Sequence, residues 1–78
     1  MLLEIITPDK RLFSAEVKSV KLPGSEGSFG VLKNHAPLIS SLKKGNIKVV
    51  DEQKQHHSFP IKGGVVEVLK NKITVLAE

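Results

Sequence analysis

Hydrophobic and polar residues alternate in short runs along most of the chain, and the hydrophobic positions nowhere keep the spacing of an amphipathic helix. Turn-forming residues interrupt these runs roughly every eight to ten residues, as they do between the strands of a sandwich or barrel. We therefore predict an all-β fold, a small antiparallel β-sandwich of about eight to ten short strands.

The first half of the chain contains a change in the phase of this alternation. The odd-numbered positions from Phe13 to Val17 are apolar, whereas Val20 and Leu22 carry the apolar side chains of the following run. This shift at Lys18-Ser19 predicts a β-bulge or a strand that bends from one sheet into the other.

The second half of the chain predicts an edge strand and a hairpin. Pro60 lacks the N–H that a ladder bond requires, so the run that contains it is expected at a sheet edge. Apolar runs at 65–69 and 73–77 flank the short connection Lys70-Asn71-Lys72, which predicts a hairpin. With 78 residues and no linker or repeat, the chain is expected to form one domain, residues 1–78.

The composition excludes several kinds of chemistry. Because the chain has no cysteine, it has no disulfide, no thiolate nucleophile and no zinc site built on sulfur. The beginning, MLLEIITPDKR, lacks the basic start and long apolar core of a signal peptide, and no run reaches the length of a membrane span. We therefore expect a soluble, cytoplasmic protein that does not insert directly into a membrane.

The formal charge of +4 suggests a nucleic-acid partner. However, the lysines are spread from Lys10 to Lys72 with only Lys43 and Lys44 adjacent, and three Phe are the only aromatic residues. Charge scattered in this way is more typical of a solvated surface than of a nucleic-acid groove. A small basic β-barrel that binds nucleic acid is kept as the alternative function.

Candidate catalytic and metal-binding residues do not form a recognisable set. His56 and His57 are adjacent and point to opposite sides of a strand, whereas ligands of one metal share a face. Solvent-facing positions beside a polar turn are the simpler interpretation of both. Ser25 lies in G-S-E-G, which is not the G-x-S-x-G of a nucleophile elbow. We therefore predict no catalytic residue, no metal site and no cofactor.

The glycines and the remaining histidine have structural interpretations. Gly24, Gly27 and Gly30 are spaced only loosely like a phosphate-binding loop, and neither Gly-Lys-Ser/Thr nor a helix follows them. Glycines that supply positive φ in a turn are the favoured interpretation. His35 precedes Ala36-Pro37, where proline restricts the backbone. It is either a structural histidine bonded to the backbone or a residue that contacts a partner.

Three stretches of the chain resemble one protein family. GSEGSFGVLKNHAPL, residues 24–38, is similar to the signature G-S-E-G-x-x-G-x-x-x-x-H-A-P-L of the ε subunit of F-type ATP synthases. Residues 63–68 with ITVLAE at 73–78 resemble the end of the family's N-terminal domain, and residues 3–14 resemble its beginning. The resemblance covers the whole chain in order and implies a β-sandwich.

The resemblance also implies a function and two partners. It implies a non-catalytic subunit of the central stalk, the rotor of an F1Fo ATP synthase, on the cytoplasmic side of the bacterial inner membrane. Docking on the γ subunit and contact with the polar loops of the c-ring would couple proton translocation to ATP synthesis. We expect the c-ring side to consist of Ser25, Glu26, Gly27 and Ser28, and the γ side of His35, Ala36, Pro37 and Leu38.

The chain departs from the family pattern in three ways. Many members have Pro-Gly in place of Lys33-Asn34, although Asn also tolerates left-handed backbone geometry. Ser28 occupies a position that is often polar or charged in the family. Typical members continue into a two-helix hairpin that carries inhibition of ATP hydrolysis and, in some, nucleotide binding. Neither of these functions is expected of residues 1–78.

Overall fold

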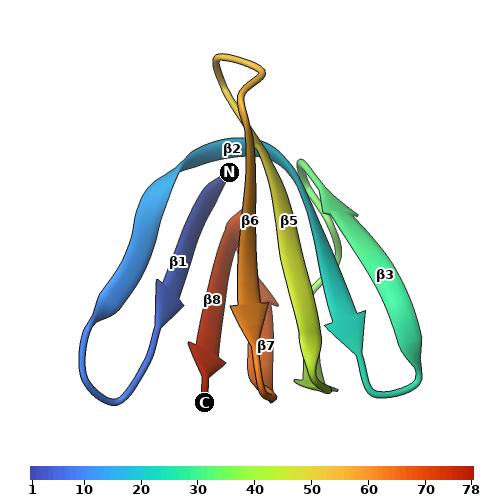
Figure 1. The fold of residues 1–78 in the computed structure, drawn as a ribbon. Coiled ribbons are helices and arrows are strands. Elements are labelled where there is room, and N and C mark those ends of the chain that lie inside the picture. Colours follow the sequence, from blue (N-terminus) through green and yellow to red (C-terminus); the bar gives the residue numbers. More distant parts are fainter.

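The computed structural model describes residues 1–78 and contains eight strands and no helix. The all-β prediction is confirmed, although one strand, with 14 residues, is not short. The structure contains no helix that is long and apolar enough to cross a membrane. In chain order the strands are β1 (Leu2–Ile6), β2 (Arg11–Gly24), β3 (Gly27–Leu32), β4 (Leu38–Leu42), β5 (Gly45–Asp51), β6 (His56–Ile61), β7 (Gly64–Leu69) and β8 (Lys72–Ala77) (Figure 1).

The strands form two layers that share β2. In the first layer the hydrogen-bonded order is β4, β7, β8, β1 and the beginning of β2. In the second layer the end of β2 lies between β3 and β5, and β6 follows β5. Figure 1 shows β2 arching over the top of the molecule from one layer to the other. The parallel pairing of β1 with β8 places the first and last strands side by side, with the N-terminus at one end of the molecule and the C-terminus at the other (Figure 1). The other pairings are antiparallel.

The bend in β2 lies at the predicted change of phase. Val17 is opposite Asp51 of β5, and Ser19 is opposite Val50, so Lys18 is an extra residue in β2. A bulge of this kind bends the strand and shifts its alternation by one position. The predicted bulge and the predicted bend between sheets are therefore the same feature.

Apolar side chains from the inner faces of both layers form one core. Sixteen apolar residues are buried in this cluster, and no polar or charged residue is buried. Val17 and Val20, on the two sides of the bulge, are both about 1% exposed, as the phase change requires. Full burial of a side chain of this size stabilises the fold by about 1.5–3 kcal/mol. The inner faces therefore hold the two layers together.

The predicted hairpin and edge strand are both present. β7 and β8 pair antiparallel, and the connecting residues Lys70 and Asn71 have φ values of 50° and 63°. Two successive positive φ angles match the right-handed twist of paired strands. Pro60 lies in β6, which pairs only with β5 at the end of the strand order, so no ladder bond is lost.

The prediction of positive φ is confirmed for one of the three glycines near the β2–β3 turn. Gly27 has a φ of 131°, whereas Gly24 and Gly30 do not have positive φ. A Cβ atom on Gly24 would lie 2.8 Å from the Phe29 ring, so the small size of glycine is what this position requires. At Gly30 the nearest atom would be 3.9 Å away, so a side chain would fit there.

Candidate protein-docking surfaces

The turn between β2 and β3 presents the residues predicted to face the c-ring. Ser25, Glu26, Gly27 and Ser28 are all exposed. The Ser25 N–H donates to the Ser41 carbonyl at 3.0 Å, and the Ser41 hydroxyl donates to Ser25 Oγ at 2.8 Å. These bonds tie the turn to the end of β4. The turn therefore has a defined shape while its polar groups remain accessible.

The loop between β3 and β4 carries the residues predicted to face γ. The His35 N–H donates to the Leu32 carbonyl at 3.2 Å, and its Nδ1 lies 2.7 Å from the Ala36 carbonyl oxygen. Because a carbonyl only accepts, Nδ1 carries the proton and donates. Asn34, at a φ of 64°, adopts the left-handed geometry that asparagine tolerates, and its N–H donates to Asn71 Oδ1 at 3.0 Å. The loop is thus tied to the β7–β8 turn.

The structure gives His35 and Leu38 partly structural roles. His35 is half-buried and bonded to the backbone, which is one of the two interpretations of its sequence context. Leu38 is half-buried and packs against the core, opposite Val68 of β7. Ala36 and Pro37, in contrast, are exposed. They are the accessible part of the predicted γ segment.

The two predicted segments lie at opposite ends of β4. β4 begins immediately after Pro37 and ends at Leu42, which pairs with Gly24 next to the β2–β3 turn. In Figure 1 the β2–β3 turn lies at the bottom of the view, and the end of β3 lies at the top. The structure therefore does not bring these segments into one site. It separates them by the length of a strand.

The first layer also carries a hydrophobic surface that the sequence analysis did not identify. On its outer face, Val65 of β7 is opposite Leu76 of β8, and Ile39 of β4 is opposite Glu67. A hollow of about 360 Å³ next to Ile39 includes Pro37 and thus adjoins the γ segment. We refer to the exposed apolar residues as the outer apolar patch: Ile39, Val65, Leu69 and Leu76, with 72%, 43%, 44% and 56% exposure.

A sequence signal for this patch does exist. Within 73–77 the alternation assigns Ile73, Val75 and Ala77 to the core, so Leu76 is apolar at a position where a solvated strand would be polar. Val65 and Leu69 stand on the outer face of β7 in the same way. When both the odd-numbered and the even-numbered positions of a strand carry apolar residues, both faces of the strand are apolar.

Glu4 lies on the same outer face and joins three strands. Its carboxylate is 3.1 Å from Lys72 Nζ of β8 and 3.6 Å from the Arg11 guanidinium of β2. The hydrogen bond from Lys72 holds the pKa of Glu4 below its ordinary value, with a partial opposing effect of desolvation. This ionic cluster keeps the β1 side of the outer face polar.

A second polar cluster lies in the β5–β6 hairpin. His57 Nε2 donates to Asp51 Oδ2 at 2.8 Å, and the N–H groups of Gln53 and Gln55 donate to Asp51 Oδ1, each at 2.9 Å. The bond from His57, followed by the backbone bond from Gln55, lowers the pKa of Asp51 below its ordinary value. The His57 ring also lies 5.3 Å from the Phe13 ring, between centroids.

This geometry corrects the prediction that both β6 histidines simply face solvent. His56 is exposed, whereas His57 is half-buried and bonded to Asp51. The opposite orientation of the two side chains is confirmed. No group of three or more His, Cys, Asp or Glu residues in the chain is placed to hold a metal ion.

The comparisons with known proteins identify the family. Residues 1–78 match the family model for the β-sandwich domain of the ATP synthase delta/epsilon chain. The chain belongs to this family. The ATP synthase epsilon chain of Campylobacter curvus is 50% identical to it over 97% of this chain, and that of Maridesulfovibrio salexigens is 46% identical over 100%. The chain spans 59% and 54% of the length of these two curated relatives.

Solved structures show that this delta/epsilon-family domain shares its fold with ATP synthase chains. One chain in the mitochondrial ATP synthase of Euglena gracilis, solved as OSCP/F1/c-ring in rotational state 1, matches with a TM-score of 0.92. The match has 23% identity and covers 99% of this chain and 49% of that one. A chain in the central stalk and c-ring of the Tetrahymena thermophila enzyme matches with a TM-score of 0.82, 18% identity, and coverage of 99% and 62%. The nucleic-acid alternative gains no support from these relatives or structures.

Proposed function

We propose that residues 1–78 form the single β-sandwich domain of a non-catalytic central-stalk subunit of an F1Fo ATP synthase. The domain docks on the γ subunit, contacts the polar loops of the c-ring, and thereby helps to couple proton translocation to ATP synthesis. The observation that carries this proposal is the match of the whole chain to the delta/epsilon β-sandwich family, with relatives named ATP synthase epsilon chain.

The same relatives support a proposed location. They come from bacteria, which supports a peripheral position on the cytoplasmic side of the inner membrane as part of F1Fo. In this position the domain contacts protein loops of the ring and does not insert directly into the bilayer. The proposed role requires no cofactor and no nucleic acid.

The outer apolar patch supports docking on γ. Four exposed apolar residues on one sheet face, beside the accessible Ala36 and Pro37, form the kind of surface that protein partners cover. A partner seated there would remove Ile39, the most exposed of them, from water. We therefore extend the γ side from the segment His35–Leu38 to include the patch.

The position of the β2–β3 turn supports a second, simultaneous contact. The turn lies at the opposite end of β4 from His35–Leu38, so a partner at one end leaves the other end free. A packed two-layer core between the ends deforms little, which suits an element that transmits rotation. We place the c-ring at Ser25–Ser28.

Single tryptophan substitutions in the β2–β3 turn test the contact with the c-ring. Ser28→Trp and Glu26→Trp place a large ring on an exposed turn without disturbing the core, and we expect about tenfold or greater weakening of binding to the isolated ring complex. Proton-coupled ATP synthesis should fall in parallel. Gln53→Trp, in the β5–β6 turn at the other end, serves as the control. Unchanged binding and coupling in Ser28→Trp and Glu26→Trp would remove this turn from the interface.

A further inference from the structure

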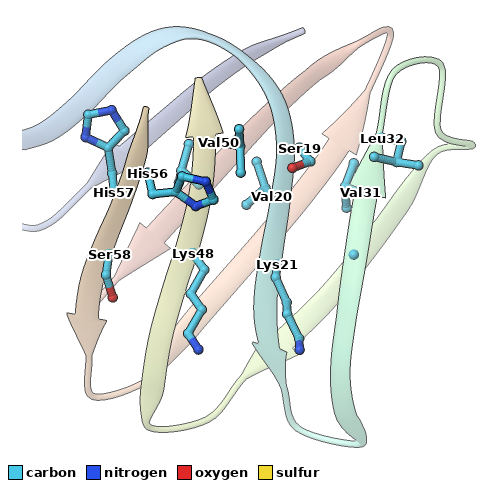
Figure 2. A pocket seen from close by; sticks show the side chains of 12 residues that line it. Ser19, Val20, Lys21, Val31, Leu32, Lys48, Val50, His56, His57 and Ser58 are labelled. Atoms are coloured by element: carbon cyan, nitrogen blue, oxygen red, sulfur yellow. The ribbon is translucent and has the colours of Figure 1, made fainter. Parts of the chain in front are cut away.

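The second layer has an outer face of its own, distinct from the outer apolar patch. Across β3, β2, β5 and β6 the strand register forms two neighbouring rows of side chains. Figure 2 shows Lys21 and Lys48 side by side on β2 and β5, with Leu32 and Val50 further along the strands. The first row is Leu32, Ser19, Val50 and His56, and the second is Gly30, Lys21, Lys48 and Ser58.

Small residues leave this face hollow. Gly30 has no side chain, and Ser19 and Ser58 are short, so the face contains a hollow of about 560 Å³. Much of its wall is apolar, and Leu32, at its edge, is 64% exposed. A Cβ atom on Gly30 would meet nothing closer than 3.9 Å. The space is therefore large enough to receive an apolar side chain from another molecule.

The charge on this face is positive and uncompensated. Lys21 and Lys48 are directly opposite each other on neighbouring strands, an arrangement of like charges that destabilises a sheet. A second hollow, of about 290 Å³, is lined by the same two lysines and also by Lys43 and Lys44. Neither hollow is lined by Asp or Glu, and none of the chain's four ion pairs includes one of these four lysines.

We propose that this face, which we term the lysine face, binds an extended acidic segment of a partner protein. The segment places one large apolar side chain in the hollow beside Leu32 and Val50. Its flanking carboxylates pair with Lys21 and Lys48, and further carboxylates reach Lys43 and Lys44. Binding relieves the repulsion between the opposed lysines and removes the exposed Leu32 side chain from water.

The shape of the face favours a protein segment over other anions. A bilayer presents a broad, flat surface, which does not fill a hollow in a sheet. A nucleic acid would use aromatic side chains for base stacking, and neither hollow is lined by one of the three Phe residues. A peptide with an apolar residue between carboxylates satisfies both the hollow and the lysines.

The proposal does not depend on the proposed function. The outer apolar patch belongs to the first layer, whereas the lysine face belongs to the second. Ser28 of the Ser25–Ser28 turn lines the smaller hollow, but no residue of the turn lines the larger one, where the apolar side chain binds. Loss of binding at the lysine face is therefore separable from loss of binding to γ or the ring.

The test uses the folded chain and a short synthetic peptide with one phenylalanine between pairs of glutamates. Amide chemical shifts are followed by NMR as the peptide is added. We expect shifts confined to the lysine face, centred on Lys21, Gly30 and Lys48, and an affinity that falls as salt is raised. A peptide with alanine in place of phenylalanine should bind at least fivefold more weakly, and one with lysine in place of glutamate should not bind.

Variants separate the hollow from the charge. Gly30→Val fills the hollow with a residue that strands favour and that meets no close atom, so the fold is retained while peptide affinity falls at least fivefold. Lys21→Glu reverses one charge and should weaken binding at least tenfold. Lys10→Glu makes the same charge change in the β1–β2 turn and should leave binding unchanged.

Three results would overturn the proposal. The first is the absence of localised shifts up to the solubility limit of the phenylalanine peptide. The second is equal affinity of the alanine peptide, which would leave the hollow without a role. The third is equal weakening by Lys10→Glu and Lys21→Glu, which would indicate attraction to net charge alone. The dispersed amide spectrum of each variant confirms that it is folded in the same experiment.

Discussion

At the scale of single residues, the contacts of Asp51 depend on strand register. In the β5–β6 ladder His57 is opposite Val49, which places its ring within reach of the Asp51 carboxylate. The sequence predicts that His56 and His57 diverge, because adjacent strand residues always do. It does not predict the bond to Asp51, because that bond depends on the register of the two strands and on the Phe13 ring that packs beside His57.

Substitution of His57 should change the titration of Asp51. The hydrogen bond from His57 is the largest cause of the lowered pKa of Asp51, and His57→Ala removes it. The pKa of Asp51 should therefore rise toward its ordinary value, while the backbone bonds from Gln53 and Gln55 retain part of the shift. Because the folded-state pKa is lowered, the stabilisation from Asp51 is present above its unfolded pKa, about 4, and is lost as pH falls through the folded value. His57→Ala should lose less stability over that acid range than the parent chain.

Carbon-detected NMR titration of the Asp51 carboxyl group measures this change directly. His56→Ala is the matched control, because His56 is exposed on the opposite face of β6 and makes no bond to Asp51. An Asp51 pKa that is the same in His57→Ala and in the parent chain would show that the 2.8 Å contact does not set the titration.

At the scale of elements, β2 determines how the two layers connect. Alternation along the sequence is sufficient to predict the bend, because the apolar positions change parity at Lys18-Ser19 and both sets must face the same core. The parallel pairing of β1 with β8 is different. It joins residues from opposite ends of the chain, such as Leu3 and Ile73, and no local pattern specifies such a partner.

The same contrast explains which candidate surfaces could be predicted. The Ser25–Ser28 and His35–Leu38 segments were predicted because they resemble family motifs, and the structure shows that both are held by hydrogen bonds. The outer apolar patch and the lysine face assemble from strands that are distant in sequence. Lys21 and Lys48, for example, become neighbours only through the β2–β5 register.

Deletion of Lys18 should disrupt the fold. Without the extra residue, the alternation on one side of the bulge is reversed, so either Val17 or Val20 must leave the core. Loss of several buried side chains at about 1.5–3 kcal/mol each exceeds the margin expected for a domain of this size. We expect no cooperative unfolding transition in urea, whereas Lys18→Ala, which keeps the bulge, should unfold within about 0.5 kcal/mol of the parent chain. A deletion variant with a normal transition would show that the bulge is dispensable.

At the scale of the whole molecule, the sandwich presents separate surfaces on a compact body of 27 × 24 × 18 Å. The outer apolar patch lies on the outer face of the first layer, and the lysine face lies on the outer face of the second. The His35–Leu38 segment and the Ser25–Ser28 turn lie at opposite ends of β4. A body with one shared core moves these surfaces together. This arrangement suits a domain that is held by several partners at once.

The most direct test of the central claim is calorimetric titration of the chain into purified γ subunit. We predict a saturable one-to-one complex with a negative heat-capacity change, because apolar surface is buried at the outer apolar patch. Ile39→Glu should weaken this complex about tenfold or more, and Gln53→Glu should not. The absence of a saturable complex, or equal binding by Ile39→Glu and the parent chain, would contradict the account.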